Sequence, residues 1–197
     1  MVAMARFLTA VIVAASIFIF PASAQNLNRG FLAYSQGDFA TALREWLPLA
    51  KRGSTLAQYN LGRLYFSGEG VDQDYGEANK WFTRAAAQGY PPAQNSLGIL
   101  YNKGLGVRLD HTKATNWFRH SAEQGYTPAQ ISLGLQYTDG LGVAKDFTEA
   151  VKWFNVAADL GEAAAPSHRD AITGLMTPEE IAKAREMANL WLLKNRR

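Results

Sequence analysis

The chain has 197 residues, with 20 Lys and Arg against 17 Asp and Glu and a formal net charge of +3. This near balance argues against a nucleic-acid-binding domain, in which Lys and Arg gather on one face. The sequence contains no cysteine, which excludes disulfides, thiolate nucleophiles and cysteine-ligated zinc.

The first 24 residues have the pattern of a signal peptide. Arg6 precedes an uncharged, mostly apolar run over 7–20, which is short for a membrane span, and small residues follow up to Ala24. We predict cleavage near Ala24 and a mature protein in the periplasm or outside the cell. The alternative is an uncleaved N-terminal anchor. No later segment is long and apolar enough to cross a membrane.

Residues 25–54 are predicted to form an N-terminal capping hairpin, with helices over 26–36 and 40–52. Asp38 and Gly53 lie 36 residues before Asp74 and Gly89, their counterparts in the next unit (74 − 38 = 36 and 89 − 53 = 36). The intervening loop is shorter than in that unit. A terminal repeat that departs from its neighbours is expected of a cap.

Residues 55–162 contain one 36-residue unit three times, at about 55–90, 91–126 and 127–162. Ala57, Ala93 and Ala129 show the step (93 − 57 = 36 and 129 − 93 = 36). A repeat of this length predicts stacked helical hairpins. Apolar residues at helical spacing place the two helices of each unit. The first helices are expected at 57–66, 93–102 and 129–138, and the second at 75–88, 111–124 and 147–160.

The loop of each unit carries its own structural signals. Gly68 and Gly70, with their counterparts, are expected to take positive φ or to allow a tight turn. Asp74 stands just before the second helix, where its carboxylate caps free backbone N–H groups. Gly89 follows that helix and suits a left-handed position.

Residues 163–197 are predicted to be a partial repeat followed by a capping helix. Thr177 and Glu180 form a capping box, and Pro178 fits the first helical position. One apolar stripe along this helix predicts that it covers the last hairpin. The stripe comprises Ile181, Ala184, Ala188, Trp191 and Leu192.

Together these positions resemble the Sel1-like repeat family, a relative of the tetratricopeptide repeats. The resemblance implies an all-α fold, a right-handed α/α solenoid, and a non-catalytic scaffold or adaptor for other proteins. His111 is a departure, because it stands where Tyr75 and Phe147 stand. The positions that carry the resemblance are Ala57, Leu61, Gly62, Tyr65, Gly68, Gly70, Val71, Asp74, Ala78, Trp81, Phe82, Ala86 and Gly89.

No residue pattern points to catalysis, and we expect no catalytic residue, no metal and no cofactor. Of the three histidines, His111 is interpreted as filling an aromatic packing position, with a catalytic role as the alternative. The carboxylates of the first loop could be read as a calcium site. The spacing of an EF-hand is absent, which favours a cap and a solvated loop. No phosphate-binding motif occurs.

Nine residues that differ between the units form the candidate binding site, here called the variable stripe. In each first helix they fall at i, i+4 and i+7 on one face. We interpret this face as the concave, partner-binding side; the alternative is that these residues only fill gaps between repeats. Gln58, Gln94 and Gln130 recur beside it and could bind a ligand backbone or one another. The variable stripe comprises Tyr59, Arg63, Phe66, Asn95, Ile99, Asn102, Ile131, Leu135 and Thr138.

The sequence therefore predicts a monomeric interaction scaffold of the cell envelope that binds a peptide or another protein, with no nucleic acid. The alternative is an envelope hydrolase or a protein that binds cell-wall glycan. A catalytic acid and base should interrupt the repeat pattern as a pair, and no pair of Asp, Glu or His residues does so.

Overall fold

The fold is all-α, as predicted. The structure is a computed structural model that describes residues 22–195. Over this range the chain has helices and no strand. The predicted signal peptide lies outside the described residues except for 22–24, which form the start of α1. The helices are α1 (Ala22–Ser35), α2 (Phe39–Lys51), α3 (Thr55–Ser67), α4 (Tyr75–Ala87), α5 (Pro91–Lys103), α6 (His111–Glu123), α7 (Thr127–Asp139), α8 (Phe147–Asp159), α9 (Ala165–Thr173) and α10 (Pro178–Asn195).

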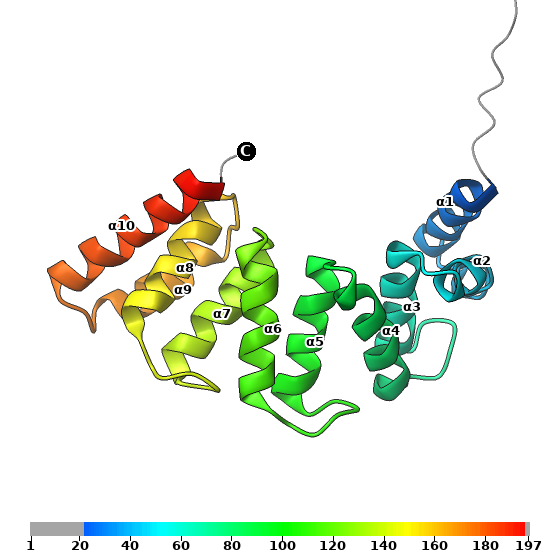
Figure 1. The fold of residues 1–197 in the computed structure, drawn as a ribbon, viewed down its shortest axis with the longest axis horizontal. Helices are drawn as coiled ribbons and strands as arrows, with labels where there is room; N and C mark the ends of the chain where they lie inside the picture. Colours follow the sequence, from blue (N-terminus) through cyan, green and yellow to red (C-terminus); the bar gives the residue numbers. More distant parts are fainter. Residues whose placement is uncertain (1–21, 196–197) are drawn as a thin grey trace, which may run out of the picture.

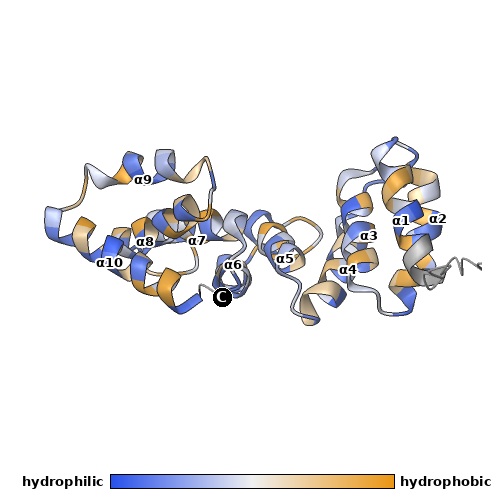
Figure 2. Cartoon of the chain, turned by 90° about the horizontal axis from the view of Figure 1, so that it is seen from above, coloured by the Kyte–Doolittle hydropathy of each residue, from blue (hydrophilic) through white to orange (hydrophobic). Residues whose placement is uncertain are grey.

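Consecutive helices pack in pairs, and the pairs stack in chain order. α1 packs on α2, α3 on α4, α5 on α6 and α7 on α8, while α2–α3, α4–α5 and α6–α7 join successive pairs. The result is an arc whose N-terminal and C-terminal helices rise on the same side of the middle helices (Figure 1). Seen from above, the helices follow one another along the long axis, and hydrophobic and hydrophilic residues alternate around them (Figure 2).

The helices end where the sequence indicates. Gly68 closes α3 in the left-handed region at φ 73°, and Gly89 follows α4 at φ 83°. The Asp74 carboxylate accepts hydrogen bonds from the N–H groups of Gly76 and Glu77 at 2.8 and 2.9 Å. The first helices begin two residues earlier than predicted, because Ser54 caps α3 and prolines open α5 and α7.

Each hairpin closes through a glycine in its first helix. A Cβ atom on Gly62 would lie 2.5 Å from the ring of Phe82, so only glycine lets α3 approach α4 this closely. The same contact joins Gly98 to Phe118 in the next unit. These phenylalanine rings are almost wholly buried, which makes them the centre of each hairpin's core.

A second glycine sets how successive units sit on one another. Gly70 lies against the backbone at Phe39, the first residue of α2, and Gly106 lies in the same way against Tyr75 of α4. Gly142 repeats the contact at His111. The loop of each unit thus rests on the start of the second helix in the unit before, and a side chain there would push the two apart.

The C-terminal helix closes the array differently from a standard hairpin. The predicted capping box forms, with Thr177 N–H donating to the Glu180 carboxylate at 2.8 Å and Glu180 N–H donating to the Thr177 hydroxyl at 3.2 Å. α10 then packs mainly on α8 rather than on α9. The ring of Trp191 meets Trp153 edge-on at 5.8 Å between centroids. The predicted stripe of α10 therefore covers the last full unit.

Candidate binding surface

The variable stripe lies partly at the surface and partly between hairpins. Asn95 is buried at 8% exposure, and the other eight members are half-buried. The two interpretations left open by the sequence, a binding face and inter-repeat packing, both stay predictions. The stripe runs across α3, α5 and α7.

The aromatic members of the stripe pack mainly on α4, the second helix of their own hairpin, and Tyr59 also reaches Tyr90 at the start of the next unit. The ring of Tyr59 lies 5.8 Å from Phe82 and 5.1 Å from Tyr90, centroid to centroid. Phe66 meets Tyr75 edge-on at 5.4 Å. These two stripe residues therefore contribute to packing, and truncating them would disturb the fold as well as any surface they share.

The stripe opens into a pocket between α5 and α7. Ile99 and Asn102 of α5 and Leu135 of α7 line it, and the volume is about 250 Å³. The core residue Phe118 and the carboxylate-bearing Asp139 also line it. Three of the nine predicted site residues thus come together around one accessible hollow.

The polar members of the stripe are held in place by other side chains. The Asn102 carbonyl oxygen lies 2.8 Å from Nδ1 of His111 and accepts a hydrogen bond from Gln136 Nε2 at 3.2 Å. Thr138 donates its hydroxyl to the Gly134 carbonyl at 2.9 Å. Asn95 Oδ1 is buried and has no donor among the described residues.

Arg63 is the one stripe residue with a formal charge, and it is oriented by a tyrosine. Its Nη2 donates to the Tyr34 hydroxyl at 2.8 Å, and its guanidinium lies over the Tyr34 ring at 5.0 Å from the centroid. The Tyr34 hydroxyl in turn donates to a Glu69 carboxylate oxygen at 2.8 Å. No carboxylate of the described residues lies within ion-pair distance of Arg63, in contrast to Arg29 and Lys152.

Two tyrosines that sequence reasoning missed lie at the starts of α5 and α7. Tyr90 and Tyr126 occupy the N-cap positions of α5 and α7 but make no side-chain cap there. Burial raises the pKa of Tyr59, and the neighbouring Tyr126 raises it further while Arg63 lowers it. The pKa values of Tyr90 and Tyr126 are also raised, first by burial, and lowered in part by Arg63. Their period-36 spacing was the only sequence signal.

The recurring glutamines bind the backbone of the preceding unit. Nε2 of Gln58 donates to the Ala50 carbonyl at 3.1 Å, and Gln94 and Gln130 make the same bond eight residues back. They do not bind one another, as the sequence had allowed. Instead, Gln88 Nε2 donates to Gln58 Oε1 at 2.7 Å, and an equivalent pair forms in the next unit.

We call the Gln88–Gln58 and Gln124–Gln94 pairs the glutamine ladder. The third unit lacks such a pair, because Leu160 stands where the donating glutamine is expected. Gln130 Oε1 is therefore fully buried without a donor among the described residues. Leu160 itself is 46% exposed. The defect lies at the C-terminal end of the array, next to the helix that closes it.

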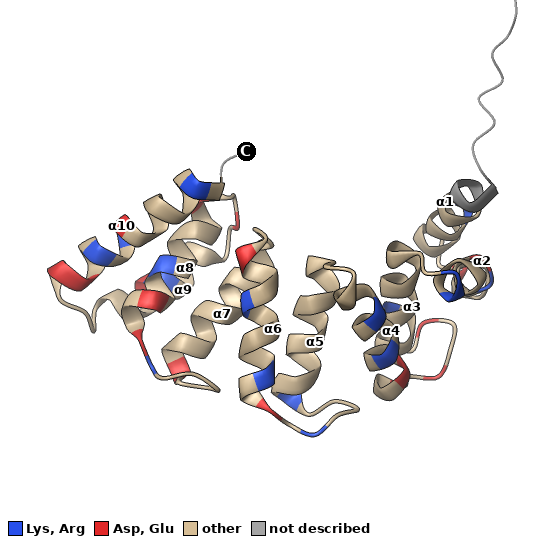
Figure 3. Cartoon of the chain, viewed as in Figure 1, with Lys and Arg blue, Asp and Glu red and all other residues tan. Residues whose placement is uncertain are grey.

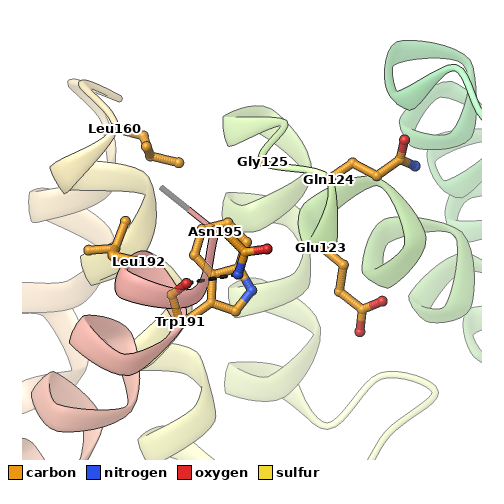
Figure 4. A pocket seen from close by; sticks show the side chains of 7 residues that line it. All are labelled: Glu123, Gln124, Gly125, Leu160, Trp191, Leu192 and Asn195. Atoms are coloured by element: carbon orange, nitrogen blue, oxygen red, sulfur yellow. Dashed lines mark hydrogen bonds between the residues drawn. The ribbon is translucent and has the colours of Figure 1, made fainter. Parts of the chain in front are cut away.

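A larger pocket, of about 650 Å³, lies at this C-terminal end (Figure 4). Leu160 flanks it on one side, the α6–α7 turn flanks it on the other, and Trp191 and Asn195 of α10 lie between them. Sequence reasoning missed this pocket, because it depends on where α10 docks.

Charged residues of both signs are dispersed along the arc (Figure 3).

Comparison with known proteins identifies the repeat. The sequence model described as "Sel1 repeat" matches residues 55–90, 91–126 and 127–162, which is more than half of the chain. The chain belongs to the Sel1 repeat family. The family predicted from the sequence is thereby confirmed, and members of this family commonly act as protein-interaction scaffolds. No curated protein matches this Sel1 repeat protein.

Two solved structures share the fold of this Sel1 repeat protein. A Sel1 repeat protein from Oxalobacter formigenes is 31% identical with a TM-score of 0.70, over 75% of this chain and 59% of that one. A protective antigen of uropathogenic Escherichia coli strains, displaying an SLR fold, is 27% identical with a TM-score of 0.62. That match covers 87% of this chain and 46% of the antigen. The chain thus spans roughly half the length of each structure.

The histidines of this Sel1 repeat protein lie apart and make packing contacts. His111 contacts Asn102, His120 meets the edge of Trp117, and His168 stacks on Phe154. Among residues 22–195, no three His, Asp or Glu side chains are grouped so that they could hold a metal ion. No helix in this range is long and apolar enough to cross a membrane.

Proposed function

We propose that this Sel1 repeat protein is a non-catalytic scaffold of the cell envelope that binds a peptide or protein partner on the variable stripe. The observation that carries the proposal is the pocket between α5 and α7, because three residues of the variable stripe, Ile99, Asn102 and Leu135, line it together. Residues needed only for stacking, such as Leu61 and Leu97, are the same in every unit and almost wholly buried.

The chemistry of the stripe supports a peptide as partner. Ile99 and Leu135 offer half-exposed apolar surface, and Asn102 offers an amide beside it. An extended chain could lay alternate side chains against the pocket, with its backbone facing the polar groups. The N-terminal charge and hydropathy pattern supports export, and we propose that the mature protein is a monomer in the periplasm or outside the cell.

Site-specific photo-crosslinking tests this assignment. A photoreactive amino acid would replace Ile99 in one variant and the exposed loop residue Leu109 in a matched control, both expressed in the native host. We expect one discrete protein adduct from position 99 and none from position 109. The purified partner should then bind wild type at least tenfold more tightly than the Leu135→Ser variant, with both proteins folded by circular dichroism.

Two results would contradict the proposal. Equal adducts from both positions would place the partner elsewhere, and turnover of cell-wall glycan by the purified protein would favour an envelope hydrolase. Fractionation of the same cells tests the location separately, since a cytoplasmic pool of full-length protein would refute export.

A further inference from the structure

Arg63 is not explained by the repeat. Its counterparts are Ile99 and Leu135, so stacking of the units does not require an arginine, or any charge, at this position. It is half-buried on the same helix face as Tyr59, one turn further along α3. Its nearest carboxylate in the hydrogen-bond network, that of Glu69, reaches it only through the Tyr34 hydroxyl, so no direct ion pair offsets the cost of partly burying the guanidinium.

The guanidinium is held in one orientation before any partner binds. The Tyr34 ring supports one face of it, and the Tyr34 hydroxyl occupies a single Nη2 donor at 2.8 Å. Glu69 lies beyond that hydroxyl and fixes the phenol through its own 2.8 Å bond. The other N–H donors of Arg63 have no acceptor among the described residues. Such orientation reduces the entropy lost on binding.

Tyrosines from two other parts of the array converge on the same place. Tyr90 at the start of α5 packs edge-on against Tyr59 at 5.1 Å. Tyr126, at the start of α7, adds to the rise in the pKa of Tyr59, after burial as the main cause. The phenols of Tyr59 and Tyr90 carry neutral O–H groups, which can donate hydrogen bonds. Guanidinium and hydroxyl donors together suit a carboxylate.

We propose that Arg63, with the hydroxyls of Tyr59 and Tyr90, binds the carboxylate of an internal Asp or Glu side chain in an extended peptide partner. This inference rests on the proposed function and adds an acidic residue to the partner. The array continues on both sides of α3, with α1–α2 before it and α5 after it, which fits a chain that passes through. The apolar side chains of Ile99 and Leu135 call for apolar partner residues beyond the acidic one.

A random-peptide selection tests the proposal without knowledge of the natural partner. A phage-displayed library of 12-residue peptides, fused through their C-termini so that no free carboxyl end is presented, would be selected on the wild-type protein. We expect the enriched peptides to share one Asp or Glu followed by apolar residues. A synthetic, amidated peptide of this sequence should bind the Arg63→Met variant at least tenfold more weakly than wild type.

Matched variants separate charge from structure. Arg84→Met removes an exposed arginine that lies over Trp81, and this control should leave affinity unchanged. Arg63→Met should fold normally, because isoleucine and leucine occupy the equivalent sites. Replacing the acidic residue of the peptide by its amide should weaken binding to wild type by the same factor and leave binding to Arg63→Met unchanged.

The other outcomes overturn the inference in distinguishable ways. Enriched peptides without an acidic residue, whose binding depends on Ile99 and Leu135 but not on Arg63, would refute the carboxylate site and leave the proposed function standing. A free peptide acid that binds where its amide does not would show recognition of a chain terminus instead. Failure to enrich any peptide that depends on the variable stripe would count against both proposals.

Discussion

Replacing Leu160 by glutamine should stabilise this Sel1 repeat protein by completing the glutamine ladder. A buried acceptor without a donor costs about 1–3 kcal/mol, and the new amide would supply the donor that Gln88 and Gln124 supply in the earlier units. Leu160 is 46% exposed, so little apolar burial is lost. After the entropy of ordering a glutamine side chain is subtracted, we expect a gain of about 1 kcal/mol.

Thermal and urea unfolding followed by circular dichroism would measure the effect. A gain of this size corresponds to a rise of about 2–4 °C in Tm for a domain of this length. Gln124→Leu makes the opposite change in the second unit and should lower stability by about 1–2 kcal/mol. Leu160→Ala is the control for loss of the leucine itself.

The gain should vanish when Gln130 is also replaced by leucine, because the acceptor is then gone. An equal gain from Leu160→Gln in both backgrounds would refute the ladder as its cause. So would a gain from Leu160→Ala of the same size. Stacked repeats can unfold in segments, so the comparison should use the same transition in every variant.

Three further predictions concern helix contact and pH. Gly98→Ala should destabilise the protein by about 1–3 kcal/mol, because its Cβ would collide with Phe118, whereas Gly174→Ala, with open space around it, should be nearly neutral in the same denaturation assay. Burial raises the pKa of Tyr59 above 10.0, so its contribution to stability is present below pH 10 and is lost as the pH rises through the folded value; Tyr59→Phe should flatten this alkaline loss in urea midpoints. The Lys113 N–H lowers the pKa of Asp110 below 3.8, so its contribution is present above that pH and is lost as the pH falls through the folded value; Asp110→Asn should remove this part of the acid dependence, and an unchanged acid transition would contradict it.

The repeat unit was predictable from sequence because its determinants are local and recur. The caps at Asp74 and Gly68 and the capping box at Thr177 each depend on residues within one turn, so spacing alone located them. The fold followed, since a hairpin with a conserved apolar pattern has to bury that face against its neighbour. The helix ends differed from prediction by two residues at most in the three full units.

The candidate site was less predictable, because its contacts cross between units. The stripe was found as a set of differences, but sequence could not say that Tyr59 packs on Tyr90 while Ile99 faces a pocket. The orientation of the Arg63 side chain depends on Tyr34, which lies 29 residues earlier, in a unit whose loop has a different length. The docking of α10 on α8 depends on an edge-on contact between Trp153 and Trp191 that no repeat spacing encodes.

Gly70, Gly106 and Gly142 each contact the start of the second helix in the preceding unit. Every junction between units therefore has the same backbone contact. Tyr90 and Tyr126 end equivalent segments, so removing 91–126 would join Tyr90 to Thr127 in a chemical setting that already exists at Tyr126. Duplicating the same segment would repeat the same glycine contact as well. The arc can therefore be lengthened or shortened by whole repeat units. The length of a bound partner segment would change by one unit at a time as well.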